Sequence, residues 1–436
     1  MPRSQFAALR RFTMLALVSI AAICCISLHA QDCMFQSADG IPYRWRPKEF
    51  KPQTGQSHGT VLKILAFGDS VVWGNGDKKR HRIVWLVSQN VANATGRTVE
   101  LDSYAHSGAM LGSAATAGEE SNLPVHNGTQ YGDLGAPAPT TWQQAQCATK
   151  KDSGAEIVLM DGCINEVGAL NIALPPIFTH VTTDDIRKAV FNNCAVDMRN
   201  TLELVAKKFS NANKIVLLNY FLVVSDDSKP KPFAEEQGQA SPQQTSVQRQ
   251  QQEKELEKVV KKTAKQAPVA ADRHPSPDEV KKQVQAWEAN SVEFLNDTTG
   301  CFSWAIASAT GGGQDAPSPE ADPAKAPCAP FRPIQNAAEP ESRIVLATIP
   351  PDPEFSYGAA NTHLWLLPLL FYPHDEMYWT RALECTFHPF RGDKTCYFNP
   401  IAHPDPTGAQ CYSQTIMKEL GMPWAPPKGT PKVKCE

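Results

Sequence analysis

VLKILAFGDSVVWGNG, residues 61–76, is the stretch that decides the fold. Its first part, 61–67, is a short and almost wholly apolar run, which is typical of a buried β-strand. The run stops abruptly at Gly68-Asp69-Ser70, where a glycine permits a sharp turn. Ser70 therefore follows the carboxyl end of a strand, and this is the edge at which open α/β sheets bind their ligands.

The rest of the chain repeats this alternation of strands and helices. Four more strand-like runs lie at 98–104, 156–161, 214–224 and 343–348. Between them, 81–95 and 184–209 carry apolar side chains at helical spacing, and the second stripe includes Cys194. Alternating strands and helices favour a parallel sheet that is covered by helices on both faces.

Residues 225–276 interrupt the pattern, because they are rich in Gln, Lys, Glu, Pro and Ser. Such a composition buries too little apolar surface to offset the entropy of ordering, so we expect a mobile insertion within which 251–265 could form an exposed helix. Helical order is predicted to return at Ser276-Pro277-Asp278-Glu279, which has a capping residue, a proline at the first helical position and a capping-box glutamate.

The N-terminus predicts export. Arg3, Arg10 and Arg11 precede an apolar stretch at 13–28, and Leu28-His29-Ala30 offers a cleavage site, so residues 1–30 are interpreted as a signal peptide. An uncleaved membrane anchor is the alternative. Of the 12 cysteines, two lie inside this segment and the remaining ten form an even set, which suggests disulfides in an exported chain.

Connectivity cannot be derived from sequence, although Cys385 could pair with Cys396 and Cys33 with Cys435. The chain has 436 residues, 42% of them hydrophobic, and a formal net charge of −3. That charge gives no support for a nucleic-acid partner or for a polybasic membrane-binding surface.

Three segments resemble motif blocks of the GDSL/SGNH hydrolases, a family of serine esterases and lipases. The first is Gly68-Asp69-Ser70, in which Ser70 resembles the nucleophile. The second is 104–108, in which the backbone N–H of Gly108 would face an oxyanion. The third is 161–166, in which the Asn165 side chain would donate to the same oxyanion. Outside the resemblance, these three positions are ordinary places for a turn serine, a turn glycine and a helix-capping asparagine.

The resemblance also provides a base, His403, in the sequence Ala402-His403-Pro404-Asp405 before a C-terminal helix. His363 lies among apolar residues and is interpreted as a packed core histidine, whereas His374 and His388 are weaker rivals. The family's usual aspartate, three residues before the histidine, is replaced by Pro400. A backbone carbonyl in the turn at 398–400 is therefore expected to orient the imidazole, and Asp393 and Asp405 are further options.

The resemblance implies a three-layer α/β/α, flavodoxin-like fold with a five-stranded parallel sheet over 58–425. An N-terminal extension at 31–57 would precede it and a tail at 426–436 would follow. The implied function is ester hydrolysis through an acyl-enzyme, with no cofactor or metal, in a secreted or periplasmic protein that is not inserted in a membrane. The substrate would be a small-molecule or lipid ester, and apolar residues near Ser70, including Val71 and Val72, would suit either an acyl chain or the core. An O-acetyl esterase acting on acetylated glycans and a non-catalytic binding protein with the same fold are the alternatives.

Overall fold

The computed structural model describes residues 47–53, 55–112, 140–168, 171–172, 180–228, 277–310, 343–357, 359, 361–365, 375–377, 402–426 and 433–435. Its centre is one twisted sheet in the strand order β1-β3-β2-β4-β5-β6. The strands are β1 (Lys48–Phe50), β2 (Leu62–Phe67), β3 (Val99–Ser103), β4 (Ile157–Met160), β5 (Lys214–Leu218) and β6 (Ile344–Ala347). The signal peptide and the Cys385–Cys396 pair were predicted for residues outside these ranges.

Strands occur at all five predicted positions, and each pairs in parallel with its neighbour in the sheet. The predicted count of five is wrong, because β1 adds an antiparallel edge strand against β3. This strand lies in the N-terminal extension and has only three residues, of which Phe50 alone is buried. The fold is therefore a mixed α/β fold with a mostly parallel sheet of six described strands.

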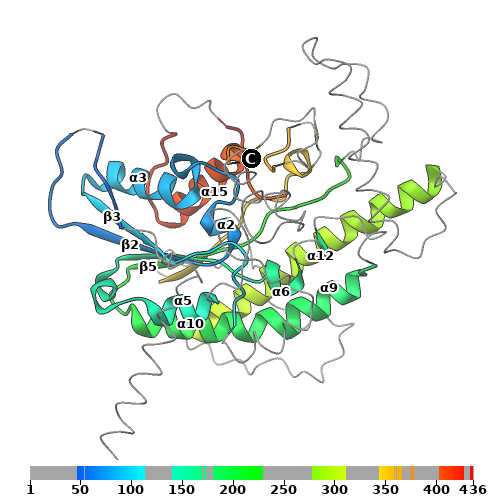
Figure 1. Cartoon of the computed structure of the whole chain (residues 1–436), viewed down its shortest axis with the longest axis horizontal. Coiled ribbons are helices and arrows are strands. Elements are labelled where there is room, and N and C mark those ends of the chain that lie inside the picture. The colour runs from blue at the N-terminus through cyan, green and yellow to red at the C-terminus, as the bar shows by residue number, and fades with distance from the viewer. Residues whose placement is uncertain are drawn as a thin grey trace, which may run out of the picture.

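Helices cover both faces of the sheet (Figure 1). On one face lie α3 (Ile83–Thr95) and α15 (Pro406–Glu419), and on the other lie α5 (Thr141–Cys147), α10 (Val196–Lys208) and α12 (Pro277–Ala309). The shorter helical elements are α2 (Ser70–Trp73), η1 (Lys79–His81), η2 (Lys150–Gly154), α6 (Ile164–Val167), α9 (Thr183–Ala189) and η6 (Pro353–Phe355). The central strands β2, β4 and β5 are almost wholly buried, as strands covered on both faces must be.

The helix predicted at 184–209 is continuous but not uniform, because a π-helical segment, η3 (Val190–Ala195), joins α9 to α10. Its apolar stripe is buried as expected, with Val190, Cys194 and Met198 fully inaccessible. Cys194 does more than pack, since it forms a disulfide with Cys163 in the loop after β4. A widened helical turn therefore meets one of the predicted site loops.

Two expectations about the chain's outer parts need correction. Cys435 pairs with Cys411 and not with Cys33. The predicted insertion at 225–276 begins later than expected, because Ser225 and Ser228 are buried and both form hydrogen bonds with the Ser356 hydroxyl. The remainder of that segment, 229–276, lies outside the described residues, and α12 begins at Pro277 as predicted. No described helix is long and apolar enough to cross a bilayer.

Candidate active site

Ser70 occupies the first position of α2, immediately after β2. Asp69 is the N-cap of this helix, and its Oδ1 accepts a hydrogen bond from the backbone N–H of Val71 at 2.8 Å. Ser70 is largely buried, with 5% of its surface exposed. As the first residue of a helix, it has a backbone N–H that lacks an intrahelical acceptor and is available to other oxygens.

The turn before Ser70 depends on a glycine. Gly68 has φ 141°, a region that residues with a side chain rarely adopt, and a Cβ placed on it would lie 1.7 Å from Asp161 Oδ1. The adjacent α5 supports the same turn, because the Gln144 amide accepts from Gly68 N at 2.7 Å and donates to Gly68 O at 3.0 Å. No side chain other than hydrogen fits at this position.

Two buried carboxyl groups lie below the turn. Asp161, at the end of β4, accepts from the backbone N–H of Asp69 at 2.7 Å through Oδ1 and from that of Val72 at 3.1 Å through Oδ2. The hydroxyl of Tyr220 donates to Asp69 Oδ2 at 2.7 Å and accepts from Ile164 N at 3.0 Å. This network joins the ends of three strands, so it fixes the Ser70 turn relative to the loop that carries Asn165.

Burial shifts the ionisation of this pair. Removal from water raises the pKa of both Asp69 and Asp161, and the neighbouring charge of Asp69 raises the pKa of Asp161 further. The phenol of Tyr220 has a raised pKa for the same reasons, which are burial and the two carboxylates beside it. Two adjacent carboxyl groups in a dry site favour retention of a proton between them.

His403 meets Ser70 from the far end of the sequence. Its Nε2 lies 2.6 Å from Ser70 Oγ, although the two residues are 333 positions apart. The loop of His403 is held on both sides by the backbone of Trp365, whose N–H donates to His403 O at 2.8 Å and whose carbonyl accepts from Ala402 N at 2.9 Å. A β-bridge between Leu364 and Pro404 continues this pairing. The serine and the histidine are therefore within direct hydrogen-bonding distance.

The other histidines do not compete at this position within the described chain. His363 stacks on Phe355 with ring centroids 3.9 Å apart, in agreement with a packed histidine. Burial lowers the pKa of His363 to about 4, so its imidazole is neutral at neutral pH. His374 and His388 lie outside the described residues.

The partner of the second imidazole nitrogen stays a prediction. Asp405, one of the options, is the N-cap of α15, and its Oδ1 accepts from the backbone N–H groups of Thr407 at 2.7 Å and Gly408 at 2.9 Å. Its described hydrogen bonds therefore serve the start of a helix and not the imidazole. The turn at 398–400 and Asp393 lie outside the described residues.

Gly108, in a loop, and Asn165, in α6, lie in two segments that contact each other. Gly108 has φ 80° in the loop after β3, and the Asn165 Nδ2 donates to Ala109 O in that loop at 2.7 Å. Glu166 reinforces the contact, because its Oε1 accepts from the backbone N–H of Leu111. Glu166 therefore structures these segments, and the oxyanion roles of Gly108 and Asn165 stay predictions.

Sequence reasoning missed two features of this region. Cys163, the N-cap of α6 with φ 125°, is disulfide-bonded to Cys194 and immediately precedes the short helix that carries Asn165. Trp73 stacks on His106 with ring centroids 4.8 Å apart and 13° between the planes. Neither contact has a local sequence signal, because each joins residues more than thirty positions apart.

The suggested acyl-binding role of Val71 and Val72 is not supported, because both are buried in the central core. A small cavity of about 30 Å³ lies behind the His403 loop. Its lining includes Phe221, Ile349, Leu364 and Pro404. Within the described residues no cluster of three or more His, Cys, Asp or Glu side chains could hold a metal ion.

Comparison with known proteins adds little to this geometry. The sequence matches no protein-family model and no curated protein. Among solved structures, the chain is similar to the lipase Lip_vut3 from a goat rumen metagenome, with 18% identity and a TM-score of 0.24. The similarity covers 37% of this chain and 65% of that lipase. An overlap of this extent carries no argument about activity, so function has to be argued from the residues themselves.

Proposed function

We propose that this protein is an exported serine esterase of the SGNH type that hydrolyses carboxylic esters through an acyl-enzyme. The observation that carries the proposal is the 2.6 Å separation between Ser70 Oγ and His403 Nε2. A nucleophile and a base at this distance form the minimal arrangement for acyl transfer. The order of the five parallel strands, β3-β2-β4-β5-β6, also agrees with a flavodoxin-like sheet, in which ligands bind at the carboxyl edge.

In the proposed reaction, His403 Nε2 accepts the Ser70 proton while Ser70 Oγ attacks the ester carbonyl carbon. The carbonyl oxygen becomes negative and is stabilised by the N–H groups of Ser70 and Gly108 and by the Asn165 amide. As the C–O bond breaks, His403 returns the proton to the leaving alcohol. Water then attacks the acyl-enzyme with His403 as the base, which releases the acid and restores Ser70.

The disulfide-bonded cysteines agree with export to an oxidising compartment. Cys163–Cys194 and Cys411–Cys435 are both disulfides, and Cys301 is disulfide-bonded as well. Disulfides form and persist in secreted and periplasmic proteins and are rare in the cytosol of most organisms. The proposed localisation is therefore secreted or periplasmic, with a small-molecule, lipid or acetylated-glycan ester as substrate.

The test is covalent labelling with a fluorophosphonate, which reacts with activated serines. The wild type is expected to be labelled, Ser70→Ala should abolish labelling, and His403→Ala should slow it by orders of magnitude because the hydroxyl loses its base. A wild type that resists labelling would favour the non-catalytic binding protein. A series of p-nitrophenyl esters of rising acyl length then separates an O-acetyl esterase, which prefers acetate, from a lipase.

A further inference from the structure

Ser70 lies at the start of α2 and His403 lies in the loop before α15, so their 2.6 Å contact depends on the interactions that hold these two distant segments together. The His403 loop is paired with the backbone of Trp365 on both sides of the imidazole-bearing residue. Any displacement of Trp365 would therefore displace His403 with it. The question is which contact fixes Trp365 to the part of the chain that carries Ser70.

That contact is a partly buried hydrogen bond to an aspartate. The indole Nε1 of Trp365 donates to Asp77 Oδ1 at 3.1 Å. Asp77 is 1% exposed and lies in the loop after α2, seven positions beyond Ser70. The side chain of Arg82 fixes this loop by donating to Asp77 O at 3.0 Å and to Trp73 O, in α2 itself, at 3.0 Å.

We propose that Asp77 and Trp365 form a positioning pair that sets the His403 imidazole on the Ser70 hydroxyl. This role rests on the proposed function, and neither residue touches the reacting atoms. The pair is a rigid two-part link: the aspartate is fixed to the nucleophile helix through Arg82, and the indole is fixed to the base through two backbone hydrogen bonds. A misplacement of about 1 Å between nucleophile and base can cost about 10²-fold in rate, so such a link is worth maintaining.

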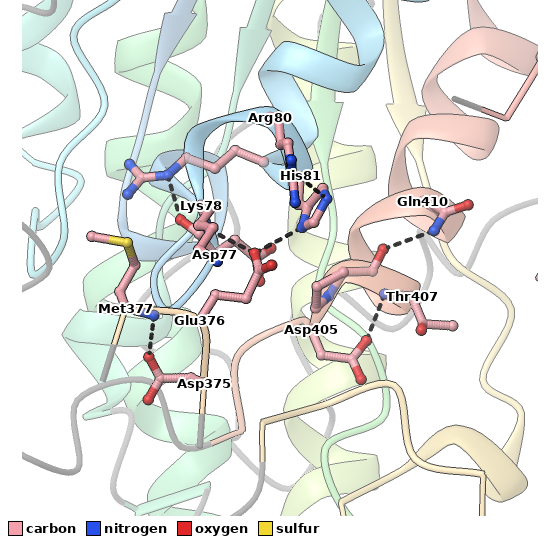
Figure 2. Close-up of polar contacts among 12 residues, drawn as sticks. Asp77, Lys78, Arg80, His81, Asp375, Glu376, Met377, Asp405, Thr407 and Gln410 are labelled. Atoms are coloured by element: carbon pink, nitrogen blue, oxygen red, sulfur yellow. Dashed lines mark hydrogen bonds and ion pairs between the residues drawn. The ribbon is translucent and has the colours of Figure 1, made fainter. Parts of the chain in front are cut away.

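The surroundings of Asp77 make a carboxyl group at this position energetically unfavourable, which argues that Asp77 has a specific role and does not merely pack. Burial raises the pKa of Asp77, and the nearby charges of Asp405 and Glu376 raise it further, whereas the charge of Arg82 and the hydrogen bond from Trp365 lower it. Glu376 belongs to a segment that lies against the same loop, where it accepts from Lys78 N at 2.8 Å and contacts His81 Nδ1 at 2.7 Å (Figure 2). A buried carboxyl group beside two others destabilises the fold unless it makes a needed hydrogen bond.

The experiment compares Trp365→Phe, which removes the indole N–H and keeps an aromatic ring, with two changes at Asp77. Asp77→Asn retains an oxygen acceptor for the indole, whereas Asp77→Leu removes it. Trp304→Phe is the matched control, because Trp304 is fully buried on α12 and its indole makes no hydrogen bond within the described part of the chain. Rates of fluorophosphonate labelling and kcat and KM for a p-nitrophenyl ester are measured at temperatures where each variant is folded by circular dichroism.

Trp365→Phe and Asp77→Leu are each expected to lower the labelling rate and kcat by roughly tenfold or more with KM little changed. Asp77→Asn should react at the wild-type rate. The double variant of Asp77→Leu with Trp365→Phe should be no slower than the slower single variant, because both changes remove the same hydrogen bond. Trp304→Phe should react as the wild type does. Full reactivity of folded Trp365→Phe or Asp77→Leu would overturn the positioning role, whereas failure of the wild type to react would overturn the proposed function instead. If Trp365→Phe does not fold, the comparison of Asp77→Asn with Asp77→Leu decides alone.

Discussion

Removal of the Cys163–Cys194 disulfide should weaken catalysis as well as stability, and the second disulfide provides a matched control. The proposed variant pair is Cys163→Ala with Cys194→Ala. Cys163 immediately precedes α6, the four-residue helix that carries Asn165, and Cys194 lies in the π-helical segment η3. The bond therefore fixes a proposed oxyanion donor to a long helix that packs against the sheet.

The magnitudes follow from the lengths of chain that the two bonds enclose. The Cys163–Cys194 pair spans 31 positions, and the chain-entropy model assigns it about 3.7 kcal/mol of stabilisation. The Cys411–Cys435 pair spans 24 positions and is assigned about 3.4 kcal/mol. Loss of either bond is thus expected to lower the free energy of unfolding by nearly the same amount.

The effects on activity should differ. Without the first disulfide, the segment of Asn165 loses its covalent restraint and keeps hydrogen bonds, which include those of Ile164 N with the Tyr220 hydroxyl and of Asn165 Nδ2 with Ala109 O. Loss of a properly placed oxyanion donor costs about 10²–10³ in rate, and partial misplacement should cost roughly tenfold. The Cys411–Cys435 pair ties the C-terminal tail to α15 and should leave kcat unchanged.

The assay measures urea unfolding of both double-alanine variants, followed by kcat and KM for a p-nitrophenyl ester in conditions where each is fully folded. Equal losses of stability with a loss of kcat in the Cys163 and Cys194 variant alone would support the reasoning. Equal kcat values in the two variants would refute it, because they would show that the Asn165 loop needs no covalent restraint.

Three further changes test other parts of the site. Gly68→Ala should abolish activity and destabilise the fold, because the new Cβ would lie 1.7 Å from Asp161 Oδ1; thermal melting and labelling of Ser70 report both effects. Asn165→Ala should lower kcat by about 10²–10³ with little change in KM if the amide serves the oxyanion, and steady-state kinetics measure this. Folding lowers the pKa of His363 from 6.5 to about 4, so between these pH values the unfolded chain binds a proton at His363 that the folded chain does not. The free energy of unfolding is therefore unaffected by His363 above pH 6.5 and falls as the pH decreases from 6.5 towards 4. His363→Phe should flatten that part of the pH dependence of the melting temperature, and an unchanged slope would contradict the assignment.

Most of the sheet could be predicted because its strands are buried on both faces. The run 62–67 is apolar except for Lys63 and the run 157–160 is apolar throughout, and their spacing leaves room for the helices between them. The edge strand β1 could not be predicted, since Lys48-Glu49-Phe50 is too short to show alternation and is defined by its partner β3. The local apolar pattern thus predicts the buried central strands and misses an edge strand that is defined by its hydrogen bonds to β3.

The candidate site divides in the same way. Ser70 and His403 lie at strand and helix ends with recognisable neighbours, and the structure brings them together. The partners that hold them have no such signal: Trp365 and Asp77 are 288 positions apart. Cys194 was interpreted as part of an apolar stripe because a buried cysteine resembles any small apolar residue until its partner is known. Residues with a proposed reactive role are therefore easier to predict than those proposed to position them.

The two buried carboxyl groups below Ser70 show why this turn is built from polar parts. A wholly apolar support would leave the backbone N–H groups of Asp69, Val71 and Val72 without acceptors, and each such loss costs about 1–3 kcal/mol in a buried position. Carboxylate oxygens satisfy all three donors, whereas an amide in place of Asp161 would offer one acceptor to two N–H groups. The pKa of both Asp69 and Asp161 is raised in the folded protein. The free energy of unfolding is therefore greatest at low pH, where both carboxyl groups are protonated, and falls as the pH rises and the second carboxyl group ionises. Asp161→Asn is consequently expected to misplace Ser70 even though it removes a charge, which is the opposite of the near-neutral outcome expected for Asp77→Asn.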